Sequence, residues 1–233
     1  MESHVQELQV AVAAPAIEAR ELYRFYHIGD DETLALRGVS MDVKAGEIVA
    51  VVGPSGSGKS TLLSCLAGLD EPDGGAVFVN GARLTRRADR ARAEVRAKSI
   101  GILLQSGNLF DHLTVEQNVK LKMRFAGQHD GGRVREVLSL VGIDERRHAY
   151  PHELSGGEAS RAGLAVALAP KPPILLADEP TGEVDSATEE RILALFDEHR
   201  ANGGASLIVS HSDAIAERAD RIVHLRDGRV VDA

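Results

Sequence analysis

The chain carries the octapeptide Gly53-Pro-Ser-Gly-Ser-Gly-Lys-Ser60 directly behind an apolar run, Glu47-Ile-Val-Ala-Val-Val52. The segment that follows, Thr61-Leu-Leu-Ser-Cys-Leu-Ala-Gly-Leu69, has the composition of a helix. A strand, a glycine-rich loop and a helix in this order are typical of a phosphate-binding loop. The same glycines would also suit an ordinary turn, but the flanking strand and helix favour phosphate binding.

The physical chemistry of this loop suits a nucleoside triphosphate. Its glycines, at positions 53, 56 and 58, allow the backbone to curl so that N–H groups point inward at an anion. The positive end of the following helix dipole lies at the same place. Lys59 can reach the β- and γ-phosphates, and the Ser60 hydroxyl can bind Mg²⁺. The sequence therefore predicts a nucleoside triphosphate ligand.

Composition limits the remaining possibilities. With 233 residues, 43% hydrophobic and 27% charged, the chain can form one large α/β domain, or a core domain with a smaller subdomain. Its formal net charge of −8 argues against a general polyanion binder, so no nucleic-acid partner is expected. The single cysteine, Cys65, is expected to be a buried packing residue.

Two membrane-related features are missing from the sequence. The N-terminus has no basic segment followed by an apolar stretch, so we predict no signal peptide. No run reaches the ~18 apolar residues of a membrane span. We therefore expect a cytoplasmic protein, in which any membrane work is done through a partner.

The pattern of apolar residues predicts a flexible tail followed by alternating strands and helices. Residues 1–15 are expected to be the tail. Strands are expected at 17–26, 39–43, 76–79, 99–104, 174–177, 206–210 and 221–225, and helices at 114–125, 133–141, 155–168, 186–199 and 213–219. The alternation in the final third implies parallel strands with crossover helices. The arginine-rich segment 83–98 could be a nucleic-acid patch, but a solvated helix is favoured in an acidic chain.

Two carboxylates follow the apolar run Ile174-Leu-Leu-Ala-Asp-Glu179. In α/β sheets, ligands bind at the carboxyl ends of strands. Asp178 can complete the Mg²⁺ site that Ser60 begins, and Glu179 can polarise a water for attack on the γ-phosphate. Taken alone, such a pair more often marks a loop boundary. Behind a nucleotide loop, we interpret it as catalytic.

His211 follows the apolar strand Ser206-Leu-Ile-Val-Ser210. A histidine after a strand is usually a packing or capping residue. Here the strand is expected to run parallel to those that carry Lys59 and Asp178, so the imidazole can point at the same phosphate or orient water. The other histidines are interpreted as surface residues.

The segment Leu154-Ser-Gly-Gly-Glu158 opens a predicted helix. The purely structural interpretation is a helix capped by Ser155, with Glu158 completing a capping box. The alternative is a second anion site formed by free N–H groups and a hydroxyl at a positive helix end. A single nucleotide site does not need two phosphate-binding helix ends from one chain. If two copies of the chain face each other, each helix end can contact a phosphate.

In this order, the motifs resemble those of the nucleotide-binding subunit of an ATP-binding cassette (ABC) transporter. The resemblance runs from about residue 17 to the end. GPSGSGKST resembles the Walker A motif, Gln105 the Q-loop, LSGGE the signature, ILLADEP the Walker B motif, residues 183–186 the D-loop and His211 the switch histidine.

The resemblance implies an α/β fold: a P-loop NTPase core with a mostly parallel sheet, an N-terminal antiparallel β subdomain, and a helical subdomain inserted at about 107–168 within a domain spanning 16–233. It also implies Mg²⁺-dependent ATP hydrolysis by a head-to-tail homodimer that holds two ATP molecules. An integral membrane permease would be the partner, with this subunit peripheral on the cytoplasmic face of the membrane.

Residue roles follow from the same resemblance. Tyr26 would stack on adenine, Ser155, Gly156 and Gly157 would clasp the opposite γ-phosphate, and Asp185 would lie across the dimer interface. Gln105 would touch Mg²⁺ and the attacking water. The full prediction assigns ATP binding to Tyr26, Gly53, Pro54, Ser55, Gly56, Ser57, Gly58, Lys59, Ser60, Thr61, Ser155, Gly156, Gly157 and Asp185, catalysis to Glu179, His211 and Gln105, and Mg²⁺ binding to Ser60, Gln105 and Asp178.

Within the family, Pro180-Thr-Gly-Glu-Val-Asp-Ser186 and the short length resemble the lipoprotein-release, cell-division and macrolide-export branch. Four features depart from common family residues: Glu158 where glutamine is commoner, Val166 where an arginine is common, Leu103-Leu104 before Gln105 where an aromatic is frequent, and the unusual D-loop pair Glu183-Val184. The Glu158 charge is expected to weaken closure on ATP.

An alternative function is a soluble ABC ATPase that acts in cofactor assembly, translation or DNA metabolism. Ribosomal relatives usually carry two such domains on one chain, and DNA-repair relatives carry a long coiled coil, for which no heptads occur here. A small-molecule kinase would leave LSGGE and His211 unexplained. Cargo and direction of transport are not encoded in this chain.

Overall fold

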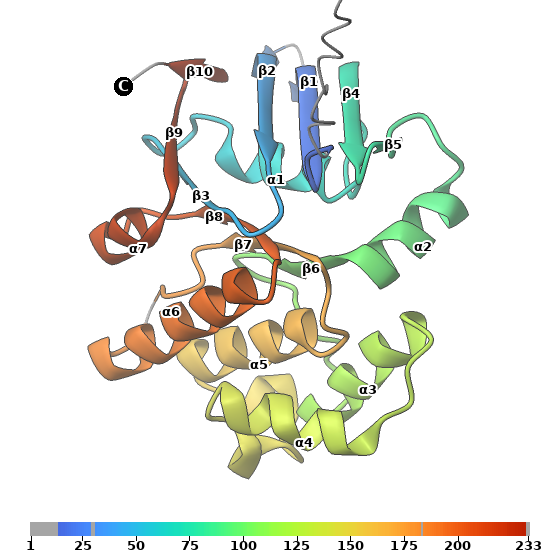
Figure 1. The fold of residues 1–233 in the computed structure, drawn as a ribbon, viewed down its shortest axis with the longest axis vertical. Helices are drawn as coiled ribbons and strands as arrows, with labels where there is room; N and C mark the ends of the chain where they lie inside the picture. The colour runs from blue at the N-terminus through green and yellow to red at the C-terminus, as the bar shows by residue number, and fades with distance from the viewer. Residues whose placement is uncertain (1–13, 29–30, 183, 232–233) are drawn as a thin grey trace, which may run out of the picture.

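The computed structural model describes residues 14–28, 31–182 and 184–231. Most of the predicted N-terminal tail, residues 1–13, lies outside the described residues, as does Glu183 of the D-loop. The described chain folds into two sheets with helices packed around the larger one (Figure 1).

The larger sheet has six strands and is almost entirely parallel. Its spatial order is β10-β9-β3-β8-β7-β6, and only β10 runs antiparallel, against β9. The strands are β3 (Ile48–Val52), β6 (Ile100–Leu103), β7 (Ile174–Asp178), β8 (Ala205–Val209), β9 (Arg221–Arg226) and β10 (Arg229–Val231). Because β3, β7 and β8 are mostly apolar, with Asp178 at the end of β7 and Ser206 in β8 as exceptions, they can be buried on both faces, as a parallel sheet requires.

The smaller sheet is antiparallel and has the order β2-β1-β4-β5. It consists of β1 (Ile17–Ile28), β2 (Asp31–Val43), β4 (Gly74–Val79) and β5 (Ala82–Arg83). It forms the upper part of the molecule in Figure 1, with α1 (Lys59–Leu66) directly below it.

The remaining helices surround the larger sheet and extend away from the smaller one. They are α2 (Asp89–Ser99), α3 (Val115–Phe125), α4 (Gly131–Leu140), α5 (Gly156–Leu168), α6 (Ser186–Ala201) and α7 (Asp213–Arg218), with short 3₁₀ turns η1 (Asp144–Arg146) and η2 (Pro151–Glu153). In Figure 1, α3 and α4 lie at the end of the molecule opposite the smaller sheet.

Two apolar cores lie on the two faces of the six-stranded sheet. Val49 and Val51 belong to the core shared with α1 and the smaller sheet. Ile48 and Ala50 belong to the core shared with α3 to α6. This alternation follows the two-residue period of a strand. The larger sheet is therefore a fixed central layer, and its carboxyl edge is held from both sides.

The structure confirms the predicted α/β architecture, with a mostly parallel sheet and an antiparallel β unit. Strand β10 was not predicted. The prediction of one helix over 83–98 is wrong at its start, because Arg83 pairs with Phe78 in the β4–β5 hairpin and Arg86 has a left-handed backbone (φ 57°). The helix begins at Asp89. The boundaries given for the inserted helical subdomain stay a prediction.

Over the described residues, none of the helices combines the length and the apolar character that a membrane crossing needs.

Candidate nucleotide-binding site

Four groups of predicted site residues follow four neighbouring strands of the larger sheet. In the order β3, β8, β7 and β6, these strands are parallel, so their carboxyl ends meet at one edge. The phosphate-binding loop follows β3, His211 follows β8, Glu179 follows β7 and Gln105 follows β6. The prediction that the His211 strand runs parallel to those of Lys59 and Asp178 is therefore confirmed.

The phosphate-binding loop passes so close to other backbone that two positions accept only glycine. A Cβ on Gly53 would lie 2.0 Å from the carbonyl oxygen of Leu225, and one on Gly58 would lie 2.4 Å from that of Ala35. Gly58 also has a left-handed backbone (φ 102°) and caps α1. The loop is thus held between β2 and β9, with the first N–H groups of α1 behind it.

Lys59 is buried inside this loop. Its side-chain Nζ donates hydrogen bonds to the carbonyls of Gly53 (2.8 Å) and Pro54 (3.0 Å). Ser57 Oγ is also buried and has no hydrogen-bond partner among the described residues. A closed loop with an inward ammonium and an unpaired buried hydroxyl has the chemistry of a phosphate cradle.

Tyr26 lies beside the start of α1, and contacts from two side chains hold its ring. Its hydroxyl donates a hydrogen bond to Asp70 Oδ2 (2.8 Å), and the Arg24 guanidinium covers one ring face at 4.7 Å from the centroid. Burial raises the pKa of Tyr26, while a hydrogen bond with Thr61, in α1, acts in the opposite direction. One aromatic surface is therefore held next to the helix that follows the phosphate-binding loop.

Two of the three residues predicted to hold Mg²⁺, Asp178 and Ser60, suit that ion, and the Mg²⁺ contact of the third, Gln105, stays a prediction. Asp178 is only 6% exposed, and within the described part of the chain its carboxylate has no hydrogen-bond or ion-pair partner. The described residues contain no cluster of three His, Cys, Asp or Glu side chains able to hold a metal alone. Mg²⁺ in nucleotide sites takes one or two protein ligands and completes its shell with phosphate oxygens and water. Asp178 and Ser60 fit that requirement.

Glu179 has a strained backbone and a fixed side chain. Its φ of 49° is left-handed, which is uncommon for a residue other than glycine. Ser210 Oγ donates a hydrogen bond to its Oε2 (2.8 Å), and His211 Nε2 lies 3.8 Å from its Oε1. Glu179 and His211 are therefore brought together, as their predicted roles need.

A surface cavity of about 590 Å³ connects these residues with Gln105. Its wall includes Gln105, Glu179, His211 and Gly156 at the start of α5. The structure thus gathers the three predicted catalytic side chains around one space, with one glycine of the LSGGE segment at its rim.

Ser155 caps α5, as the purely structural interpretation of LSGGE predicted. Its Oγ accepts a hydrogen bond from the Glu158 N–H, and Glu158 Oε2 accepts one from the Ser155 N–H. Glu158 also accepts from Arg146 (2.9 Å), and these bonds lower its pKa, the Ser155 N–H having the largest effect. The charge expected to weaken closure on ATP is thus paired with a cation within the chain.

Asp185 caps α6 through hydrogen bonds from the N–H groups of Ala187 and Thr188 and from the Thr188 hydroxyl. These bonds lower its pKa, the Thr188 hydroxyl having the largest effect. Its side chain is exposed. Within one chain, Asp185 has this structural role, and its predicted contact across a dimer stays a prediction.

Sequence reasoning missed three side chains that act on predicted site residues. Ser210 holds Glu179, Arg146 pairs with Glu158, and Asn108 bonds to the backbone at the base of the Gln105 loop. The position of Ser210, at the end of a strand directly before His211, was a usable signal. The Arg146 contact spans twelve residues and has no sequence signature.

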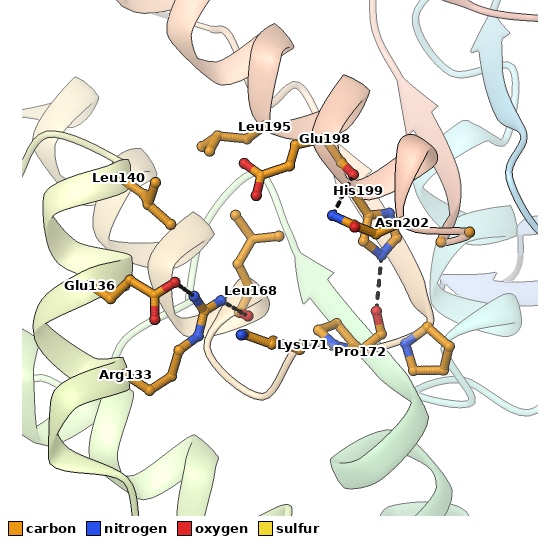
Figure 2. Close-up of a pocket in the computed structure, with 13 residues that line it drawn as sticks. Arg133, Glu136, Leu140, Leu168, Lys171, Pro172, Leu195, Glu198, His199 and Asn202 are labelled. Carbon is orange, nitrogen blue, oxygen red and sulfur yellow. Dashed lines mark hydrogen bonds and ion pairs between the residues drawn. The ribbon is translucent and has the colours of Figure 1, made fainter.

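The interpretation of every histidine other than His211 as a surface residue is wrong for His199. Figure 2 shows it in the wall of a second cavity, of about 460 Å³, between α4, α5 and α6. Its Nδ1 bonds with Ser206 Oγ (3.0 Å) and its Nε2 with the Pro172 carbonyl (2.9 Å). Burial lowers its pKa. The ring packs over Gly204, where a Cβ would come within 2.3 Å of it.

Comparison with known proteins decides the family. The family model described as "ABC transporter" matches residues 36–182, more than half of the chain. The chain belongs to the ABC transporter family. An uncharacterized ABC transporter ATP-binding protein of Thermotoga maritima is 43% identical over 217 residues, which cover 92% of this chain and 93% of that protein.

Two further relatives indicate which ABC proteins this chain resembles. The macrolide export ATP-binding/permease protein MacB of Escherichia coli K12 is 38% identical over 93% of this chain, which spans about a third (34%) of MacB. A dimeric, post-hydrolysis structure of the ATP-binding cassette MJ0796, bound to ADP and Pi, has a TM-score of 0.89 and 34% identity and covers 93% of this chain and 97% of that one. The fold is thus that of ABC ATPases, and the likeness to MacB agrees with the branch predicted from sequence.

Proposed function

We propose that this chain is the Mg²⁺-dependent ATP-hydrolysing subunit of an ABC transporter and that it powers a separate membrane permease. One observation carries the proposal: four adjacent parallel strands deliver the phosphate-binding loop, His211, Glu179 and Gln105 to one edge of a rigid sheet. The arrangement supplies a phosphate cradle, a carboxylate base and a polar side chain at the same edge of the sheet.

Each group has a task that its surroundings support. Among the described residues, the Lys59 ammonium bonds only to loop carbonyls, so it is free to exchange them for phosphate oxygens. Glu179, held by Ser210, is the general base for water, and His211 lies near enough to orient it. Asp178 and Ser60 would hold Mg²⁺, which when bound neutralises phosphate charge.

The LSGGE segment supports a dimer as the active form. Ser155 uses its oxygen to cap α5, which leaves the hydroxyl hydrogen and the N–H groups of the glycines that follow for an anion. We infer that this helix start meets the γ-phosphate held by a second copy, in a head-to-tail homodimer. The dimeric MJ0796 cassette and the ATP-binding/permease architecture named for MacB support this inference.

The test is hydrolysis by the purified chain, together with capture of its partner. Wild type is expected to release phosphate from ATP only with Mg²⁺, and Glu179→Gln is expected to lose at least 100-fold in kcat. Glu198→Gln, on the exposed face of α6, is the matched control and should keep wild-type activity. Affinity purification from detergent-solubilised host membranes should recover an integral membrane protein. Equal rates in all three forms, or recovery of soluble partners alone, would contradict the proposal.

A further inference from the structure

The loop that carries Gln105 is closed at its base by one side chain, Asn108. Its Oδ1 accepts a hydrogen bond from the Leu104 N–H (2.8 Å), and its Nδ2 donates one to the Leu104 carbonyl (2.6 Å). The Asn108 amide thus pairs with both backbone groups of the residue directly before Gln105. We call this pair of bonds the Asn108 clip.

The same side chain also sits against helix α5. A Cβ on Gly163, in the middle of α5, would lie 2.8 Å from the Asn108 Cβ and 2.9 Å from Leu103 Cδ1. Glycine is therefore needed there because the base of the loop occupies its Cβ position. Since α5 begins directly after Ser155, the clip is seated on the helix that carries the LSGGE segment.

The tip of the loop has no comparable support. Gln105 and Ser106 are exposed, and Gly107 has a left-handed backbone (φ 75°) with no atom within 4 Å of its Cβ position. Gln105 nevertheless lines the same cavity as Glu179 and His211. Its location near these residues is therefore set by the base of the loop and not by contacts at the tip.

We propose that Asn108 is a positioning residue, which fixes Gln105 relative to both Glu179 and the start of α5. Through the clip, a displacement of α5 moves the base of the loop with it, so that the LSGGE segment and Gln105 shift as one unit. The expected effect of Asn108 on ATP hydrolysis rests on the proposed function. Its effect on the position of the Gln105 loop concerns the nucleotide-free chain alone.

Mobility of the loop tip can be measured without nucleotide. The only cysteine, Cys65, is fully buried, and burial raises its pKa to about 12, so it should not compete for a thiol-reactive label. A nitroxide on Ser106→Cys then reports the tip by electron paramagnetic resonance. This variant is combined with Asn108→Ala, with Asn108→Asp, or with the control Asn202→Ala, an exposed asparagine at the end of α6.

If the Asn108 clip holds the loop, the mobility of the nitroxide should increase stepwise as its two hydrogen bonds are removed. Asn108→Ala should give a clearly more mobile nitroxide, and Asn202→Ala the wild-type spectrum. Asn108→Asp should be intermediate, because its carboxylate still accepts from Leu104 but donates nothing to the carbonyl. An unchanged spectrum in Asn108→Ala would overturn the proposal.

Steady-state kinetics of the same variants, without the label, give the second readout. Asn108→Ala should lower kcat about tenfold with KM for ATP within about twofold, since positioning and not binding is lost. Gly163→Ala should lower kcat in the same way with the amide bonds intact, although alanine favours a helix interior. Parallel losses in kcat, KM and thermal stability would mean a general packing role and overturn the proposal. A wild type that hydrolyses no ATP would refute the proposed function instead, and the spectra would still decide on the clip.

Discussion

Ser210 holds Glu179 in place across two neighbouring strands, with 2.8 Å between its hydroxyl oxygen and Oε2 of the carboxylate. The backbone adds a second tie, because the Glu179 N–H donates to the Val209 carbonyl (2.9 Å). Ser210 itself is buried, and its Oγ also accepts from the Ser212 N–H (3.1 Å). A strained backbone and a shared hydroxyl thus fix the direction of the proposed base.

Removal of the Ser210 hydroxyl should therefore slow hydrolysis without weakening nucleotide binding. We expect Ser210→Ala to lower kcat about tenfold, which corresponds to about 1.4 kcal/mol, with KM for ATP within twofold. Ser210→Thr keeps the hydroxyl and should recover most of the rate. Steady-state phosphate release measures both values. A raised KM at unchanged kcat would show that the hydroxyl serves binding instead.

Tyr26 allows the stacking and structural roles of one side chain to be separated. Tyr26→Phe loses the hydrogen bond to Asp70 but keeps the ring, so KM for ATP should stay within twofold of wild type. Tyr26→Ala loses the ring and should raise KM about tenfold, since stacking of a base on an aromatic ring is worth about 1–3 kcal/mol. Steady-state phosphate release over a range of ATP concentrations measures KM for both variants. Equal losses in the two variants would assign Tyr26 a purely structural role.

The Arg146–Glu158 pair predicts compensation between two charges. Arg146→Ala leaves the Glu158 carboxylate unpaired beside Ser155, and should raise the KM for ATP about threefold, because an exposed pair contributes little. Adding Glu158→Gln removes that charge and should restore the wild-type KM. A double-mutant cycle on KM measures the coupling. Additive effects on KM would show that the Glu158 carboxylate does not influence closure of the protein on ATP.

Lys122 predicts a pH dependence of stability. Its Nζ donates to the carbonyls of Arg96 (3.2 Å) and Ile100 (3.1 Å), and burial lowers its pKa from 10.5 to about 8, with the nearby Arg96 charge adding to the effect. Between these two pH values the unfolded chain binds a proton that the folded chain has released. The free energy of unfolding therefore rises with pH over this window, and the cost of the buried charge is fully present below about pH 8.

The matched variant is Lys122→Met, which cannot titrate. Chemical denaturation of both forms from pH 7 to 10.5 isolates the lysine, because the other titrating groups are shared. The difference in unfolding free energy, wild type minus variant, should increase by about 2–3 kcal/mol across the window. Parallel curves would mean that Lys122 keeps its proton in the folded protein up to an ordinary pKa.

Much of the fold could be predicted from sequence because local chemistry decides it. The apolar runs before Gly53, Asp178 and His211 are each long enough for a buried parallel strand, and each is followed by polar residues at the sheet edge. The segment Thr114-Val-Glu-Gln117 also has the spacing of a capping box, and in the structure Thr114 and Gln117 form one at the start of the predicted helix. Motif order then gave the family, which the comparisons confirm.

What the sequence did not reveal depends on contacts between distant segments. The start of α2 at Asp89 follows from the β4–β5 hairpin and from the bond between the Arg86 N–H and Glu71, neither of which leaves a helical signal. Burial of His199 depends on the approach of Gly204 and Pro172. Strand β10, only three residues long and exposed at each of them, has no apolar period to detect.

The proposal as a whole requires two copies of the chain to close on nucleotide. Sedimentation velocity of Glu179→Gln, with and without Mg²⁺-ATP, tests this most directly, because nucleotide that is bound but not hydrolysed should keep the dimer closed. We predict a monomer without nucleotide, a dimer with saturating Mg²⁺-ATP, and a return to monomer when Ser155→Arg is added. A Glu179→Gln protein that stays monomeric with saturating Mg²⁺-ATP would contradict the account.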